Sequence, residues 1–307
     1  MNPPLISDDV RQRVAAFLDQ PHGLYINGRW QPAQSGNTLA SEDPASGQTI
    51  ARIAAGAEPD IDLAVQAARK AFDSGPWPTL PPAARARMIE TLADAIEANA
   101  DDFALIESLD NGMPFFGARL FNVGGAVGSL RYNAGWATRL GGETTTPSLP
   151  GEFHAYTLRE PLGVAGLIVA WNMPLAMAAS KLAAALSAGC TVVLKPAELT
   201  SLSMVRLMQL VDGLGFPPGV VNLVTGLGTV AGAALVAHPG VDKVSFTGST
   251  AVGKSIIAAS AGNLKRVTLE LGGKSPTIVD DDDPIALAAQ RIAAGKFLNA
   301  GQTCIAP

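Results

Sequence analysis

Residues 162–195 read LGVAGLIVAWNMPLAMAASKLAAALSAGCTVVLK, and this stretch decides the fold. Gly163–Ala170 is a continuous apolar run of the kind found in buried strands. Pro174–Ser187 is rich in alanine, with a proline at the first helical position. Thr191–Leu194 is a second apolar run. The stretch therefore predicts a strand, a helix and a second strand.

The same alternation continues toward the carboxyl end of the chain. The expected helices are 201–214, 230–237 and 252–261, and the expected strands are 220–224, 241–246 and 267–271. Continuous apolar strands that alternate with helices indicate a parallel sheet covered on both faces. We therefore predict an α/β fold with a doubly wound parallel sheet, which binds ligands at the carboxyl ends of its strands.

The amino-terminal half predicts helices and two hairpins. Asn27-Gly28 between apolar flanks is a hairpin signal. The expected helices are 10–18, one starting at Asp60 as its N-cap, one from Met88 to Asn111 with a left-handed cap at Gly112, and 118–140. Residues 144–146 and 153–158 predict a hairpin arm, or alternatively an ordinary edge hairpin.

Length and composition exclude several classes of protein. A chain of 307 residues predicts two domains, or one and part of another. The net charge is −5 without a basic block, so we expect no nucleic-acid or membrane partner. Asn172 and Lys181 interrupt the most apolar region, which argues against a membrane span. Two cysteines and no signal pattern in Met1–Val10 indicate a cytoplasmic location.

Polar or glycine-rich residues follow each of the five expected parallel strands. They are Trp171-Asn172, Lys195–Glu198, Gly226–Gly232, Thr247–Ser249 and Glu270–Gly272. Because parallel strands end at one edge of a sheet, these groups can converge on one cleft. Together Lys195 and Glu198 suit the hydroxyls of a ribose, and the carboxylate would repel a 2′-phosphate. A surface ion pair is the alternative for that pair, and a tight turn is the alternative for Gly226–Gly232.

Gly248–Ser255 fits the phosphate-loop pattern G-x-x-x-x-G-K-[ST], with Thr277–Asp280 as a possible metal-binding strand. A nucleotide triphosphatase is therefore an alternative function. Four strands of the alternating series precede this segment, however, whereas a phosphate loop usually follows the first strand of its domain. Asp280–Asp283 is read as the start of a helix with Asp283 at its cap, and no metal site is predicted.

Cys304 and Glu270 are candidates for covalent chemistry. Small and polar residues, Gly301–Thr303, flank the cysteine and let a ligand approach. Only the thiolate of a cysteine reacts, and a nearby carboxylate can accept its proton or activate a water. The alternatives are a buried cysteine and a solvated glutamate. Cys190, before an apolar run, is expected to be buried.

From Tyr25 onward these residues resemble the NAD(P)-dependent aldehyde dehydrogenases. The resemblance rests on the order and spacing of five motifs, which are 161–164 with 171–174, 195–198, 246–249, 270–276 and 301–304. It implies that Cys304 is the nucleophile, Glu270 the general base and Asn172 a donor to the oxyanion. The implied NAD contacts are Ile168, Ala170, Trp171, Asn172, Lys195, Glu198, Gly228, Gly232, Phe246, Thr247, Gly248, Ser249, Val252, Leu271 and Gly272.

The resemblance also implies a domain plan. Residues 1–140 and 161–271 would form a Rossmann-like NAD-binding domain, 141–160 an oligomerisation arm, and 272–307 the start of an incomplete α/β catalytic domain. It implies an aldehyde substrate, NAD rather than NADP, and a homodimer or homotetramer.

Three features depart from the family pattern. Ala170 stands where the family usually has proline, and Ala251 where it usually has glutamate. The chain also ends three residues after Cys304. We therefore expect an inactive fragment, or alternatively an NAD-binding module without catalysis.

Overall fold

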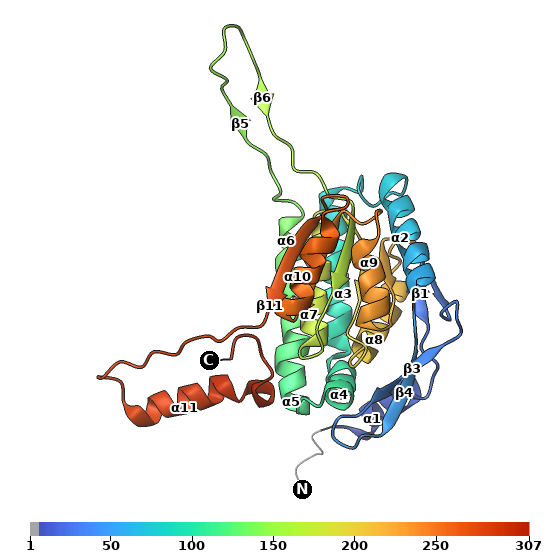
Figure 1. The fold of residues 1–307 in the computed structure, drawn as a ribbon, viewed down its shortest axis with the longest axis vertical. Helices are drawn as coiled ribbons and strands as arrows, with labels where there is room; N and C mark the ends of the chain where they lie inside the picture. The colour runs from blue at the N-terminus through green and yellow to red at the C-terminus, as the bar shows by residue number, and fades with distance from the viewer. Residues whose placement is uncertain (1–5, 307) are drawn as a thin grey trace.

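The computed structural model describes residues 6–306, which fold around a parallel sheet (Figure 1). Its strands are β1 (Leu24–Ile26), β2 (Arg29–Gln31), β3 (Thr38–Glu42), β4 (Thr49–Ala54), β5 (Thr144–Thr145), β6 (Ala155–Tyr156), β7 (Val164–Ile168), β8 (Thr191–Lys195), β9 (Val221–Leu223), β10 (Lys243–Gly248) and β11 (Arg266–Leu271). The main sheet has seven strands in the order β11-β10-β7-β8-β9-β1-β2. β7 to β11 are parallel, and β1 and β2 extend the sheet antiparallel.

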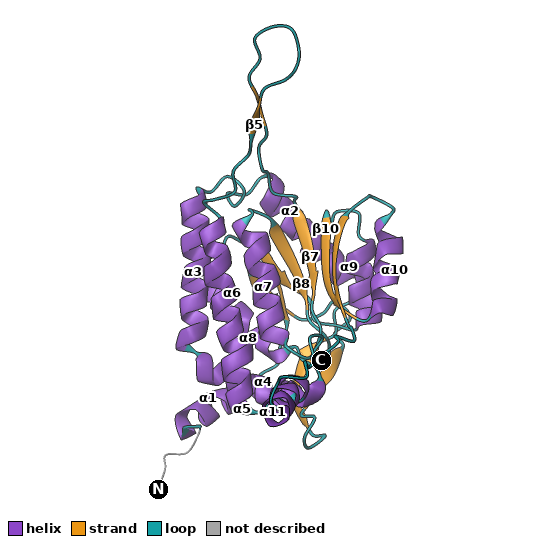
Figure 2. Cartoon of the chain, turned by 90° about the vertical axis from the view of Figure 1, so that its left-hand side faces the viewer, coloured by secondary structure: helices purple, strands orange, loops and turns teal. Residues whose placement is uncertain are grey.

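Helices cover both faces of this sheet (Figure 2). They are α1 (Asp8–Leu18), α2 (Glu58–Asp73), α3 (Pro82–Ala98), α4 (Ala100–Asn111), α5 (Phe115–Gly117), η1 (Ala118–Val123), α6 (Gly124–Trp136), α7 (Pro174–Ser187), α8 (Leu202–Gly213), η2 (Gly228–Gly232), α9 (Ala233–Ala237), α10 (Thr250–Ser260), α11 (Ile285–Lys296) and η3 (Leu298–Gly301). α3, α6, α7 and α8 pack on one face, and α2, α9 and α10 pack on the other. The predicted doubly wound sheet is confirmed.

Alternation along the strands creates two apolar cores. Ala165 and Leu167 of β7 join the core beneath α7, whereas Val164 and Ile168 join the core beneath α9 and α10. Successive side chains of a strand point to opposite faces, so each buried strand feeds both cores. This explains why these strands are apolar throughout rather than at every second position.

Most predicted elements agree with the structure, and the differences have physical reasons. Asn27 and Gly28 both have positive φ, 54° and 72°, as the hairpin signal predicts. Asp60 is not the N-cap of α2, because its carboxylate lies in the first turn and accepts the backbone N–H of Ala57. The helix predicted from Met88 to Asn111 is two helices, which meet at Asn99.

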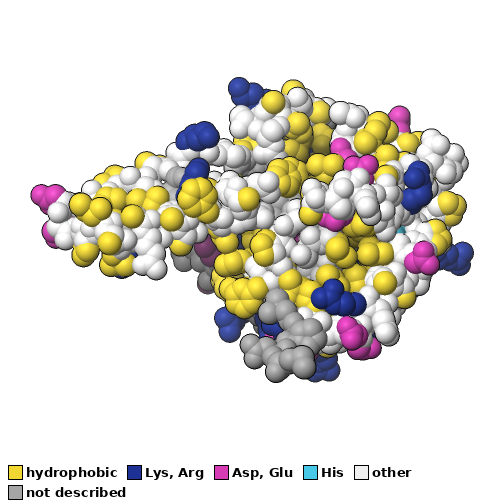
Figure 3. Space-filling view, turned by 90° about the horizontal axis from the view of Figure 1, so that it is seen from below, with side chains coloured by type: hydrophobic (Ala, Val, Ile, Leu, Met, Phe, Trp, Pro, Cys, Tyr) yellow, Lys and Arg dark blue, Asp and Glu magenta, His cyan; other side chains and the backbone are white. Residues whose placement is uncertain are grey.

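Residues 141–160 and the carboxyl-terminal segment both project from the body (Figure 1). β5 and β6 pair antiparallel within the first of these, as predicted for a hairpin arm. α11 lies in the second, and hydrophobic side chains gather on this projection (Figure 3). They include Ile285 and Phe297, which are 85% and 72% exposed.

No helix among residues 6–306 is both long enough and apolar enough to span a membrane. The predicted domain limits stay predictions, and residues 1–5 and 307 of those domains lie outside the described part.

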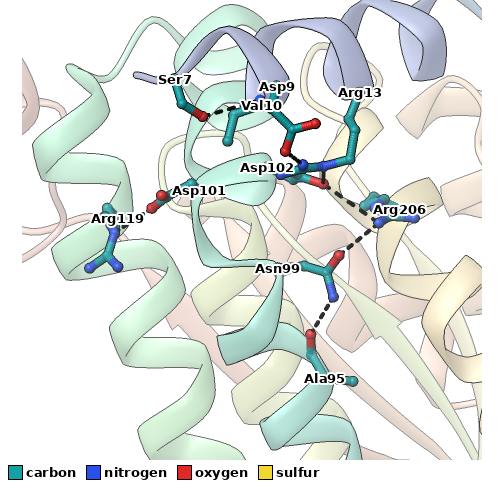
Figure 4. A network of polar contacts seen from close by, with 10 residues as sticks. All are labelled: Ser7, Asp9, Val10, Arg13, Ala95, Asn99, Asp101, Asp102, Arg119 and Arg206. Atoms are coloured by element: carbon teal, nitrogen blue, oxygen red, sulfur yellow. Dashed lines mark hydrogen bonds and ion pairs between the residues drawn. The ribbon is translucent and has the colours of Figure 1, made fainter. Parts of the chain in front are cut away.

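A polar network fastens α1 to the helical layer (Figure 4). The buried carboxylate of Asp102 accepts the Nη2 and Nε hydrogens of Arg13 at 2.7 to 3.2 Å. Arg206 of α8 lies 3.7 Å from the same carboxylate. The neighbouring Asp101 pairs with Arg119 at 2.6 Å, but both of those side chains are about half exposed.

We expect Asp102→Ala to lower the free energy of unfolding by about 1–3 kcal/mol, because two guanidinium groups lose their buried acceptor. Urea denaturation would measure this loss. Asp101→Ala is the matched control, and its effect should be much smaller because exposed ion pairs contribute little. Equal effects of the two substitutions would contradict the assignment of this network as a clamp on α1.

Candidate active site

A cleft of about 970 Å³ opens at the carboxyl ends of the parallel strands. It lies where the strand order reverses, since β7 is followed by β8 on one side and has β10 on the other. Open α/β sheets bind ligands at such a switch point, where loops diverge to opposite faces. All fifteen residues predicted to contact NAD line this cleft.

The loop after β7 carries Asn172 into the cleft and is held by hydrogen bonds. The side chain of Asn111 donates to the carbonyl of Trp171 at 2.6 Å. Asn299 donates to the carbonyl of Asn172 at 3.0 Å, and the Asn172 amide donates to the carbonyl of Gln302 at 2.7 Å. An amide nitrogen carries two hydrogens, so one remains for a ligand.

Lys195 and Glu198 form an ion pair at the end of β8, with Nζ and Oε2 3.2 Å apart. The Lys195 side chain is almost fully buried, and burial lowers its pKa. Burial alone would raise the pKa of Glu198, but backbone N–H groups, including that of Gly228, and Lys195 together lower it. Glu198 is therefore a carboxylate at neutral pH and can accept hydrogen bonds from hydroxyl groups.

A glycine lets the backbone approach closely after the end of β9. Gly226 has a φ of 151°, and a Cβ there would lie 2.4 Å from the carbonyl oxygen of Gly56. Gly228 and Gly232 follow on the cleft wall. Ser249 caps α10, and Val252 in the first turn of that helix is 47% exposed beside the cleft.

The phosphate-loop alternative is wrong in its local geometry. α10 begins at Thr250, directly after its cap Ser249, so no open loop separates β10 from the helix. Gly253 lies inside α10, and its N–H is bound to the carbonyl of Ser249. The Thr277–Asp280 segment is not a strand. A phosphate loop holds its phosphate with the N–H groups of an open loop before the helix, whereas here the first turn of α10 follows β10 directly after Ser249.

Cys304 reaches the same cleft from the far end of the chain. It lines the cleft together with Gly301, Gln302 and Thr303, and it is exposed. The predicted meeting of Cys304 and Asn172 is thus found, and the contact between Asn172 and Gln302 joins their two loops.

Glu270 does not line this cleft, contrary to the expectation that the three candidate catalytic groups share one void. It lies in a neighbouring cavity of about 510 Å³. Alternation explains the difference, because Leu271 faces the cleft and Glu270, one residue earlier, points to the opposite face. Thr247 pairs with Glu270 across the strands and borders both cavities.

Lys181 is a residue of this second cavity whose role the sequence did not reveal. Its Nζ donates to the hydroxyl of Ser245 at 2.9 Å. Burial lowers its pKa to about 8, although the nearby Glu270 opposes this shift. The helical spacing of α7 could not have shown it, because only folding brings β10 and β11 against that helix.

Carboxylates gather once among residues 6–306 at metal-binding distance, at Asp280–Asp282, and all three are exposed. The prediction that Asp283 caps the following helix is wrong by one residue. The cap is Pro284, and α11 begins at Ile285.

Comparison with known proteins agrees with this geometry. Residues 30–307 match the model of the aldehyde dehydrogenase family. The chain belongs to the aldehyde dehydrogenase family. It is 48% identical to aldehyde dehydrogenase family 2 member C4 of Arabidopsis thaliana, covering 92% of this chain and 56% of that protein. It is 44% identical to human mitochondrial aldehyde dehydrogenase, and the match covers 98% of this chain and 59% of that protein.

Solved aldehyde dehydrogenases have the same fold. An NAD⁺ complex of the Bacillus cereus enzyme is similar at a TM-score of 0.93 and 45% identity, over 96% of this chain and 60% of that one. An NAD-dependent aldehyde dehydrogenase of Sinorhizobium meliloti is similar at a TM-score of 0.90 and 39% identity. The match covers 100% of this chain and 59% of that one. The chain thus spans about 60% of the length of these relatives.

The two cysteines should differ in reactivity. Cys304 is exposed in the cleft, whereas Cys190 is buried and burial raises its pKa. We expect a maleimide to modify one thiol per native chain quickly and the second only after denaturation. Mass spectrometry of the labelled peptides would identify Cys304 as the fast site. Fast labelling that persists in Cys304→Ala would contradict the prediction.

Proposed function

We propose that this chain forms the cofactor-binding and nucleophile-bearing part of an enzyme that oxidises an aldehyde to a carboxylic acid with NAD. One observation carries the proposal. A single cleft at the switch point is lined by the cysteine, the oxyanion donor candidate, the Lys195–Glu198 pair and the glycine-rich strand ends.

The cleft suits a dinucleotide. The cationic and anionic groups of Lys195 and Glu198 can hold the two hydroxyls of a ribose. The capped amino terminus of α10 and the glycines after β9 present backbone N–H groups and a positive helix end to phosphates. NAD, when bound, supplies the hydride acceptor. The Glu198 carboxylate opposes a 2′-phosphate, which supports NAD over NADP.

Cys304 and Asn172 are suited to nucleophilic addition to an aldehyde. The Cys304 sulfur would bond to the carbonyl carbon, and the carbonyl oxygen would become an oxyanion. The free hydrogen of the Asn172 amide and the backbone N–H of Cys304 are the proposed donors. A donor placed before the charge develops contributes roughly 3–4 kcal/mol. A thiolate also leaves readily, so water can later release the acid.

Glu270 is the proposed base for that water. Its position next to Thr247, which borders both cavities, supports the idea that the carboxylate can turn toward Cys304. Lys181 faces the same cavity and would stabilise the carboxylate before it accepts a proton.

The arm 141–160 is the proposed contact with further copies of the chain, in a homodimer or homotetramer. Leu149, Phe153 and Leu158 are each more than half exposed on this arm. Burying them in an interface would be favourable, because apolar area is removed from water. A cytoplasmic location is proposed because both cysteines are free.

NADH formation from an aldehyde and NAD tests the function in a chain extended to the length of the relatives, with the 307-residue chain assayed beside it. We expect Cys304→Ala to abolish activity and Asn172→Ala to lower kcat by about 10²–10³-fold. Cys190→Ala is the control and should retain activity. A second candidate, an NAD-binding module without catalysis, predicts NAD binding and no NADH from either length.

Glu198→Gln should narrow the preference for NAD over NADP by on the order of tenfold, or about 1.4 kcal/mol. The reason is that the amide no longer repels a 2′-phosphate. Titration of the variant with both nucleotides would measure the ratio of their dissociation constants. Glu143→Gln on the exposed arm is the matched control and should leave this ratio unchanged.

A further inference from the structure

Three polar residues of one turn of α4 are buried away from the cleft. Glu107, Asp110 and Asn111 are 1%, 3% and 9% exposed. Their spacing of three and four residues places them on one face of the helix. None of them lines the cleft. Buried polar groups are costly unless they are hydrogen-bonded, so their partners reveal why this turn is polar.

Each of the three is bound to a segment that follows a strand of the main sheet. Oε1 of Glu107 accepts the backbone N–H of Leu175 at 3.2 Å. Asn111 donates to the carbonyl of Trp171 at 2.6 Å. Asp110 instead accepts the N–H of Leu202, at the start of α8. Glu107 and Asn111 therefore hold the loop after β7, and Asp110 holds the loop after β8.

Asn172 lies between the two bound residues of its loop. Trp171 is fixed immediately before it, and Leu175 is fixed in the first turn of α7, where a helix N–H has no partner of its own. Glu107 is itself held from the other side, because Oε2 accepts the side-chain N–H of Asn122 at 2.5 Å. The backbone around Asn172 is thus restrained at both ends by one rigid helix.

We propose that Glu107 and Asn111 are positioning residues that set the oxyanion donor Asn172 toward Cys304. The inference rests on the proposed function, because it assigns a task to Asn172. A donor acts only where its hydrogen meets the developing charge, and a displacement of about 1 Å can cost on the order of 10²-fold in rate. A clamp of buried hydrogen bonds gives this accuracy to a loop.

Asn111→Leu removes one of the hydrogen bonds that hold the Asn172 loop, the one from Asn111 to Trp171. Leucine has a similar size, and Oδ1 of Asn111 has no hydrogen-bond partner, so the bond to Trp171 is the interaction that is lost. Asn222→Leu is the matched control. Asn222 is fully buried and makes hydrogen bonds with Asn27, Val192 and Gly219, remote from this loop.

Two measurements test the proposal. Hydrogen exchange of the 307-residue chain should speed up in the peptide that contains 171–175 for Asn111→Leu but not for Asn222→Leu. In the extended chain, Asn111→Leu should lower kcat by about tenfold or more while the KM for NAD stays within about twofold. Unchanged exchange, or an unchanged kcat, would overturn the proposal.

A double-mutant cycle separates positioning from general destabilisation. If Asn111 acts through Asn172, Asn111→Leu should have little further effect on kcat in the Asn172→Ala background. The same fold-loss in both backgrounds would refute positioning. Glu107→Gln should keep most activity. Its amide oxygen can still accept the N–H of Leu175, and its amide nitrogen can donate to the unpartnered Oδ1 of Asn122 once the Asn122 amide flips. Glu107→Ala keeps neither hydrogen bond and should lose the activity.

The outcomes also separate this inference from the proposed function. If Asn172→Ala retains full activity, the oxyanion role itself fails. If Asn172→Ala loses activity and Asn111→Leu does not, the function stands and the clamp is refuted.

Discussion

The site depends on one constraint, the reversal of strand order between β7 and β10. Parallel strands must end at one edge, and crossovers that turn in opposite directions must leave a gap at that edge. The cleft fills this gap, and Asn172, Lys195, Glu198 and the glycines after β9 meet there because they follow the adjacent parallel strands β7, β8 and β9. The apolar cores on both faces hold this arrangement, because alternate side chains of each strand are buried on each face.

The period of two along a strand also divides the chemistry. Leu271 and Gly248 face the cofactor cleft, while Glu270 and Ser245 face the cavity of Lys181. The base candidate is therefore kept apart from the nucleophile by the sheet's own geometry. Thr247, at the strand end, is the boundary between the two cavities.

Buried polar groups decide how firmly the site is held. α4 contributes no side chain to the cleft, yet its last turn binds the loops after two of the strands that build it. Burial raises the pKa of Glu107 to about 8 and that of Asp110 to about 7, which marks the strength of their isolation from water. Burying an acid costs free energy, but an apolar residue at the same place would leave the helix N–H without an acceptor.

Local pattern determined the strands, most helices, the Asn27-Gly28 hairpin and the set of residues at the strand ends, because periodicity and turn chemistry act over a few neighbours. The position of the cleft was also predictable from this pattern, because a parallel sheet brings its strand ends together at one edge whatever the side chains are. Tertiary structure alone decided that Glu270 lies in a second cavity, that Lys181 joins it, and that Glu107 and Asn111 hold the Asn172 loop. These facts depend on which face a strand end presents and on contacts between residues 60 or more positions apart, and no local spacing encodes them.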